Sequence, residues 1–289
     1  MKYAFFPGCV LAQAAKEAYI STTAVAGALG IELVEIPGWT CCGASHVQDM
    51  EEMAALAINA RNIALAEKMA LPILTVCNTC TLMLRKAKYA LDNGEKEMIN
   101  EIIGKTGLEY TGTSEITHLL WVLINDYGLN RLKQKVVYPL KGIKAAGYYG
   151  CHLLRPPYLM NHEDHAKPHL LDDLIGALGG NTVDFAAKDR CCGFHAVLNA
   201  PRSVYRMTGE INLCAIEEGA NCIVTPCPLC QMQLDMYQPE GKLAVKTEED
   251  IPVLHLAQLI GLALGLSPEE LGMRRHVTEA ARVALFMQS

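Results

Sequence analysis

The sequence lacks the features of an exported, membrane-spanning or disordered chain. No eighteen apolar residues run uninterrupted within its 289 residues, and the apolar run at the N-terminus is too short for a signal peptide. It has no proline- or serine-rich low-complexity tract, and half of its residues are apolar, so we expect a packed core. It also lacks an excess of positive charge, with a net charge of −6, which argues against general nucleic-acid binding. We therefore expect a compact cytoplasmic protein with no membrane span and no nucleic-acid partner.

Cysteine, by contrast, is abundant, and its positions reveal an internal repeat. In a chain without an export signal, thiols serve metals or redox chemistry more often than structural disulfides. Each half contains a single cysteine, then a Cys-Cys-Gly triplet, then a Cys-x-x-Cys pair, and 34 residues separate the triplet's second cysteine from that pair in both halves. The spacing predicts a duplication into two domains, residues 1–140 and 141–289. The ten repeated positions are Cys9, Cys41, Cys42, Cys77, Cys80, Cys151, Cys191, Cys192, Cys227 and Cys230.

Short apolar runs place these cysteines on a fold. Strands are predicted at Tyr3 to Phe6, Ile31 to Ile36, Ile73 to Val76, Ala146 to Tyr149, Thr182 to Phe185 and Cys222 to Thr225. Helical patterns lie between them, as at Glu51 to Met69 and Val204 to Glu218, and the apolar stretch Val253 to Leu266 predicts a buried helix. The alternation predicts an α/β fold of two duplicated Rossmann-like domains with short parallel sheets. Because ligands gather at the carboxyl ends of parallel strands, five thiols should converge in each half.

Three kinds of site compete for these thiols. Zinc takes four thiolates and would leave the fifth unused. A thiol–disulfide relay does not need five sulfurs in each half. Iron–sulfur clusters are held by cysteine thiolates, and a cluster with more than the usual thiolate complement would employ all five. The pattern favours iron–sulfur binding over the other two.

The sequence resembles a known family at this point, the proteins with duplicated cysteine-rich CCG domains, and among them the B subunits of the heterodisulfide reductases of methanogenic archaea. The resemblance spans nearly the whole chain. It is carried by Phe-Pro-Gly-Cys at 6–9, Trp-Thr-Cys-Cys-Gly-Ala-Ser-His at 39–46, Lys-Asp-Arg-Cys-Cys-Gly-Phe-His at 188–195 and both Cys-x-x-Cys pairs. It implies two non-cubane [4Fe-4S] clusters, the first held by Cys9, Cys41, Cys42, Cys77 and Cys80 and the second by Cys151, Cys191, Cys192, Cys227 and Cys230.

The resemblance also implies a reaction and partners. The family's substrate is the heterodisulfide of coenzyme M and coenzyme B, which two electrons and two protons convert to two thiols in methanogenesis. The chain has no fused ferredoxin-like segment, so electrons would arrive from two further subunits of the complex: a ferredoxin-like iron–sulfur subunit, together with a flavin-containing subunit. Two alternatives stay open: an iron–sulfur electron-transfer subunit of a lactate, glycolate or succinate oxidoreductase without disulfide chemistry, and a zinc-stabilised interaction module.

Other polar residues near the cysteines are candidates for supporting roles. His46 and His195 follow the two Cys-Cys-Gly triplets, and each is a candidate proton donor to a departing thiolate or, equally, a hydrogen-bonded histidine at a helix start. Arg155, Lys188 and Arg190 stand close to cysteines and are candidates for binding the anionic ends of the substrate. The proline-containing segment 155–167 predicts a loop that covers the cleft.

Overall fold

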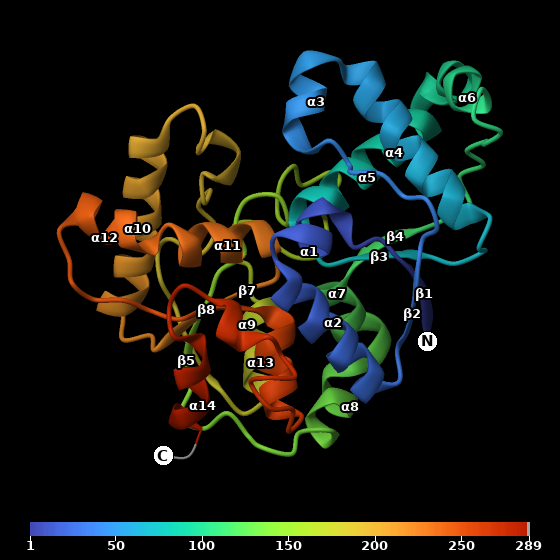
Figure 1. The fold of residues 1–289 in the computed structure, drawn as a ribbon. Coiled ribbons are helices and arrows are strands. Elements are labelled where there is room, and N and C mark those ends of the chain that lie inside the picture. The colour runs from blue at the N-terminus through green and yellow to red at the C-terminus, as the bar shows by residue number, and fades with distance from the viewer. Residues whose placement is uncertain (288–289) are drawn as a thin grey trace.

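The computed structural model describes residues 1–287, apart from the side chain of Ser45, and within them the strands form two four-stranded sheets (Figure 1). The first sheet has the order β2-β1-β3-β4 and the second the equivalent order β6-β5-β7-β8. Every neighbouring pair is parallel. The predicted fold of two duplicated α/β units with short parallel sheets is confirmed.

The first half alternates short strands with helices. Its elements are β1 (Lys2–Phe5), α1 (Gly8–Gln13), α2 (Lys16–Leu29), β2 (Glu32–Glu35), α3 (Ala44–Met50), α4 (Glu52–Glu67), β3 (Ile73–Thr75), α5 (Asn78–Ala90), α6 (Lys96–Gly104), β4 (Ile116–His118), α7 (Leu119–Trp121) and α8 (Leu129–Gln134). The predicted domain boundary at residue 140 falls in the segment between α8 and the second half.

The second half repeats the alternation. Its elements are β5 (Lys144–Gly147), α9 (Leu170–Ala177), β6 (Asn181–Val183), the short helical turn η3 (Phe194–Ala196), α10 (Pro201–Glu217), β7 (Cys222–Thr225), α11 (Pro228–Met236), α12 (Gln238–Val245), β8 (Val253–His255), α13 (Leu256–Ala263) and α14 (Val283–Phe286). The prediction of one helix over Val253 to Leu266 is wrong at its start. Three residues there pair with β7 as an additional strand before the chain turns into α13.

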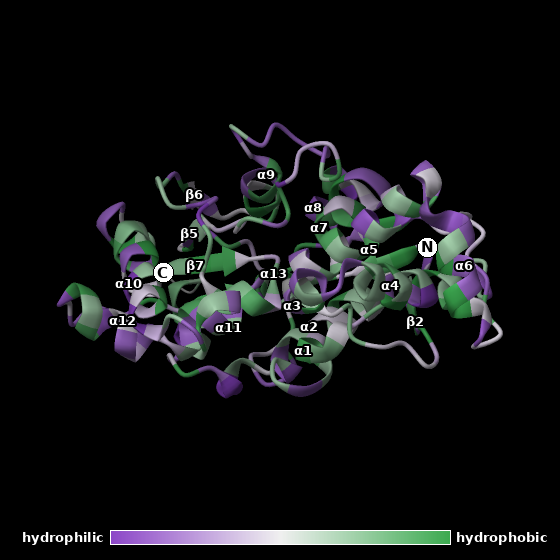
Figure 2. Cartoon of the chain, turned by 90° about the horizontal axis from the view of Figure 1, so that it is seen from above, coloured by the Kyte–Doolittle hydropathy of each residue, from purple (hydrophilic) through white to green (hydrophobic). Residues whose placement is uncertain are grey.

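The apolar pattern explains which strands are most deeply buried. All residues of β3, β7 and β8 are buried, as expected for parallel strands covered on both faces, whereas β2 and β6 form the more exposed edges. Figure 2 shows the hydrophobic colour concentrated on strands such as β7, with mixed colours on the surrounding helices. Leu74 of the first sheet and Val224 of the second belong to one continuous cluster of buried side chains. The halves therefore share a core as well as a sequence pattern.

Candidate metal centre

The repeated cysteines lie where parallel strands end. Cys9 follows β1 at the start of α1, while Cys77 and Cys227 precede α5 and α11 directly after β3 and β7. The two sets meet where the halves join: Asn78, beside Cys77, donates to the Tyr149 carbonyl of the second half at 2.7 Å, and Cys77 and Cys227 shift each other's pKa. The structure thus brings the ten cysteines of both halves into one region.

Both halves pair their thiols in the same way. The Cys9 and Cys41 Sγ atoms are 3.3 Å apart, and those of Cys42 and Cys80 are 3.5 Å apart. In the second half the corresponding cysteines, Cys151 with Cys191 and Cys192 with Cys230, shift each other's pKa. Adjacent cysteines of each triplet therefore face different partners, one towards the single cysteine and one towards the Cys-x-x-Cys pair.

The glycine of each triplet turns the chain back on the first cysteine. Gly43 and Gly193 have φ angles of 78° and 82°, in the left-handed region that glycine adopts at little cost. In this conformation each glycine N–H donates to a cysteine Sγ at 3.4 Å, Gly43 to Cys41 and Gly193 to Cys191. The triplet thus supplies both thiols and a backbone donor to one of them.

A second glycine makes room for a thiol in each half. Gly8 and Gly150 precede the single cysteines with φ angles of 73° and 68°. A Cβ atom at either position would lie 2.9 Å from a thiol sulfur, that of Cys80 or Cys230 respectively. Both sites therefore require glycine at this position to keep the sulfur atoms where they are.

Hydrogen bonding divides the thiols into thiolates and thiols. The pKa of Cys41 is lowered to about 2, because its thiolate accepts hydrogen bonds from Cys42, Cys9 and the Gly43 N–H. The pKa of Cys191 is lowered to about 6 by hydrogen bonds from Cys151 and the Gly193 N–H. The pKa values of Cys9 and Cys151 are raised by the same hydrogen bonds and by burial. Since the thiolate is the metal-binding form, the lowered pKa favours Cys41 as a thiolate ligand in the first half and Cys191 in the second, where the pKa of the buried Cys227 is lowered as well.

Two adjoining cavities are lined by these thiols. All five cysteines of the first half line a cavity of about 210 Å³, whereas the five of the second half line a tighter space of about 20 Å³. Four side chains line both spaces: Thr79, Phe194, His195 and Leu229. The two sets of thiols therefore open onto one shared cleft.

Histidines converge between the two sets. The rings of His46 and His195, the two predicted proton donors, lie 5.5 Å apart. His152 and Thr79 were missed from the sequence: the Thr79 hydroxyl lies 2.9 Å from His152 Nδ1 and 3.4 Å from His195 Nε2. The Nδ1 atom of His195 is buried without a hydrogen-bond partner among the described residues. Adjacency to Cys151 and Cys80 was the only available signal for the missed pair.

The three candidate anion-binding residues lie outside the two cavities. Arg155 donates to the Asp189 carboxylate at 2.5 Å, and Lys188 forms ion pairs with Asp172 and Asp184 at 3.2 and 2.7 Å. Arg190 is exposed, and its carbonyl accepts a hydrogen bond from Tyr148. The cleft itself is lined by thiols, histidines, small polar groups and apolar side chains.

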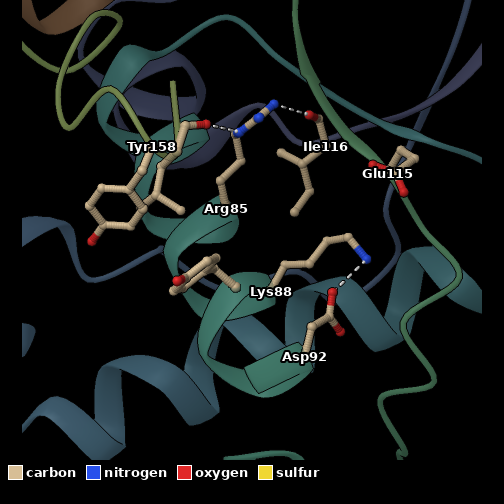
Figure 3. A pocket seen from close by; sticks show the side chains of 8 residues that line it. Arg85, Lys88, Asp92, Glu115, Ile116 and Tyr158 are labelled. Atoms are coloured by element: carbon tan, nitrogen blue, oxygen red, sulfur yellow. Dashed lines mark hydrogen bonds and ion pairs between the residues drawn. The ribbon is translucent and has the colours of Figure 1, made fainter. Parts of the chain in front are cut away.

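Part of the segment between Cys151 and α9 packs against α5 of the first half. Arg85 of α5 donates from Nε to the Leu159 carbonyl at 2.7 Å, and its Nη1 lies 3.1 Å from His162 Nε2. His162 in turn stacks on Trp121 with ring centroids 3.6 Å apart. Figure 3 shows Arg85 reaching the backbone beside Tyr158 and Ile116 in a cavity of about 180 Å³ that no cysteine lines. No residue of the predicted cover, 155–167, lines either cysteine cavity; Leu159 and His162 of this segment contact Arg85 of the first half instead.

The residues of both cavities suit a cluster of several irons. Within residues 1–287, no three His, Cys, Asp or Glu side chains are placed to hold a single metal ion. The thiols stand instead in pairs around a cavity, and the glycine beside each single cysteine leaves space next to a sulfur atom. An iron–sulfur cluster has several iron atoms and requires thiolates at several positions around it.

The fold and the site together define a class of protein: a duplicated, cysteine-rich α/β protein. The model of the cysteine-rich CCG domain matches residues 3–85 and 145–235. The chain therefore belongs to the CCG family, among the members that resemble the B subunits of heterodisulfide reductases.

Two reductase subunits are similar to the chain over nearly their whole length, and one solved structure has the same fold. The chain is 50% identical to the 8-methylmenaquinol:fumarate reductase membrane anchor subunit of Wolinella succinogenes, covering 98% of this chain and 99% of that one. It is 35% identical to the B subunit of the ferredoxin:CoB-CoM heterodisulfide reductase of Methanosarcina mazei, covering 96% and 94%. A crystal structure of a hypothetical protein from Helicobacter pylori has the same fold, with a TM-score of 0.77 and 16% identity; the match covers 96% of this chain and 51% of that one.

The expected cytoplasmic location is corrected by these comparisons. A protein that is half identical across its full length carries the name of a membrane anchor subunit, and this finding overturns the expectation. Among residues 1–287, no helix combines the length and apolar character needed to cross a bilayer.

Proposed function

We propose that this chain is an iron–sulfur electron-transfer subunit of a membrane-associated reductase complex, of the kind that couples quinol oxidation to fumarate reduction. The observation that carries the proposal is that two equivalent sets of five thiols line adjoining cavities, which share the side chains of Thr79 and His195. The identity of 50% to a fumarate reductase subunit supports this class of complex, and so do relatives that are subunits of multisubunit reductases.

The residues of the chain would hold one non-cubane [4Fe-4S] cluster in each half. When bound, such clusters take up and release single electrons. Cys41 and Cys191 supply thiolates, and Gly43 and Gly193 donate backbone hydrogen bonds that stabilise their negative charge. The other eight cysteines complete the two ligand sets, and burial of Cys42, Cys77, Cys80, Cys192, Cys227 and Cys230 limits access of water.

Partners would supply the remaining parts of the complex. A ferredoxin-like subunit would exchange electrons with this chain, and a flavin-bearing subunit would carry the two-electron chemistry. Membrane attachment would bring the assembly to its quinol.

Reduction of a heterodisulfide is the second candidate. The cleft shared by both thiol sets favours it, since Thr79 and His195 line both cavities. There, two electrons and two protons would convert one disulfide to two thiols, with His46 and His195 as proton donors. Arg155 and Lys188 would have to leave their carboxylate partners to reach the substrate anions, which is why we place this function second.

One anaerobic experiment separates the candidates. The purified chain, loaded with iron and sulfide, is reduced and its visible absorbance followed while an oxidant is added. Recovery with an oxidised ferredoxin-type protein or a quinone, but not with the CoM–CoB heterodisulfide, is the expected result. Recovery with the heterodisulfide and release of two thiols would establish the second candidate. A chain that binds zinc in preference to iron, or never bleaches, would overturn both.

A further inference from the structure

The segment that joins the two halves, residues 129–144, carries a concentrated positive charge. It contains five basic residues and no Asp or Glu, in a chain whose net charge is −6. All five side chains are exposed, and none is in an ion pair with another described residue. These residues are Arg131, Lys133, Lys135, Lys141 and Lys144.

Two exposed apolar side chains lie in the middle of this charge. Val137 and Tyr138 are 58% and 59% exposed. Their backbone N–H groups both donate to the Ala263 carbonyl of α13, at 2.8 and 3.0 Å. Leu132 and Leu140 on either side are fully buried. The segment therefore presents its exposed side chains from a backbone that is fixed to the core.

The segment lies at the end of the molecule opposite the cysteines. Lys144 begins β5, whereas the cysteines follow the carboxyl ends of the strands. In Figure 1 the chain runs from α8 along the lower edge of the molecule to β5, and α3 and the start of α10 lie at the upper edge. A surface in contact with residues 129–144 would leave the cleft accessible on the far side.

We propose that residues 129–144 are the surface by which this chain binds an anionic lipid bilayer, an inference that rests on the proposed membrane attachment. Juxtamembrane lysines and arginines are attracted to anionic headgroups, and tyrosine favours the membrane–water interface. A surface that combines unpaired basic residues with an exposed aromatic and an exposed aliphatic side chain satisfies both requirements. It accounts for attachment without a spanning helix and turns the cleft towards partner subunits.

Vesicle flotation tests this surface directly. The full chain, loaded with iron and sulfide, is mixed with vesicles of phosphatidylcholine alone or of phosphatidylcholine with an equal part of phosphatidylglycerol. We expect binding to the anionic vesicles only, and a decrease with added salt. Replacing Lys133, Lys135 and Lys141 with Gln should weaken binding on the order of 100-fold, at roughly tenfold or less per charge. The matched control replaces Lys16, Lys105 and Lys246 with Gln, because these lysines are exposed and lie outside the segment.

The outcomes separate this inference from the proposed function. Equal losses of vesicle binding in the test and control variants would overturn the proposal that residues 129–144 bind lipid. If the wild type does not bind anionic vesicles, the proposal is also overturned, and an acidic protein partner would be the occupant of this surface. Tyr138→Ser provides a second variant, expected to weaken binding in a manner that salt does not change. The visible spectrum and its bleaching report on the clusters independently of vesicle binding. A chain that binds vesicles but shows no bleaching would overturn the proposed electron-transfer function and leave the lipid-binding surface in place.

Discussion

At the scale of single residues, the glycine before each single cysteine can be tested by substitution. Gly150→Ala should prevent the second half from holding its cluster, because the new Cβ would lie 2.9 Å from the Cys230 Sγ and φ is 68°, a conformation that alanine adopts only with strain. Iron content after anaerobic reconstitution should fall by half while the far-ultraviolet circular dichroism stays unchanged. Gly8→Ala should have the same effect on the first half.

A matched control exists within the same fold. Gly27 lies inside α2, with no heavy atom within 4 Å of a Cβ placed there, so Gly27→Ala should leave the iron content unchanged and should not destabilise the helix. Full iron content in the Gly150→Ala variant would show that the sulfur positions do not depend on this glycine.

Residue-scale prediction from sequence worked where the repeat itself carries the signal. The cysteines and both triplet glycines stand at equivalent places in each half, so alignment of the halves reveals them. Thr79 and His152 come from different halves and meet only because the halves pack face to face. A repeat shows what each half contains but gives no information about which loops will touch.

At the scale of elements, α5 links the cysteines at its start to the segment that follows Cys151. Arg85→Met should lower the free energy of unfolding by about 3–6 kcal/mol, since hydrogen bonds from a charged donor each contribute about 1.5–3 kcal/mol and two carbonyls would lose their partner. Those carbonyls belong to Leu159 and Ile116, at 2.7 and 3.3 Å (Figure 3). Chemical denaturation measures the change.

Lys86, the next residue on α5, provides the control. Its only ion pair among the described residues is a 3.6 Å contact with the exposed Glu52, so Lys86→Met should cost less than about 1 kcal/mol. Similar losses for both variants would mean that Arg85 contributes through general surface charge and not through its hydrogen bonds across the halves.

Element-scale prediction failed at the last strand of each sheet. Neither β4 nor β8 is predicted by the sequence, although β3 and β6, which also have three residues, are; short strands show too little of a period of two to be recognised without a further signal. Strand β8 runs directly into the apolar α13, so the whole stretch Val253 to Leu266 has the composition of a buried helix. The first residues of this stretch adopt an extended conformation because they pair with β7, which is remote in sequence.

At the scale of the whole molecule, several buried histidines couple stability to pH. His276 is fully buried; the Gln258 side chain contacts its Nε2 at 2.8 Å and the Gln231 side chain its Nδ1 at 3.2 Å, with Asp235 at 3.6 Å. Burial lowers its pKa, an effect that Asp235 and Glu17 oppose less strongly. The pKa of His162 is likewise lowered to about 4 by burial and by Arg85.

These shifts fix the direction of the pH dependence. A histidine whose folded pKa lies below its usual 6.5 is neutral in the folded chain and protonated in the unfolded chain as the pH falls, so its contribution to stability is complete above pH 6.5 and is lost below it. The free energy of unfolding should therefore decrease as the pH falls from about 6.5 towards about 4, the pKa of His162. In His276→Gln the decrease should be smaller, whatever the variant's absolute stability. His169→Gln is the control, because His169 is exposed and Asp173 raises its pKa, so its removal should not flatten the profile. A profile for His276→Gln as steep as that of the wild type would assign the acid sensitivity to other groups.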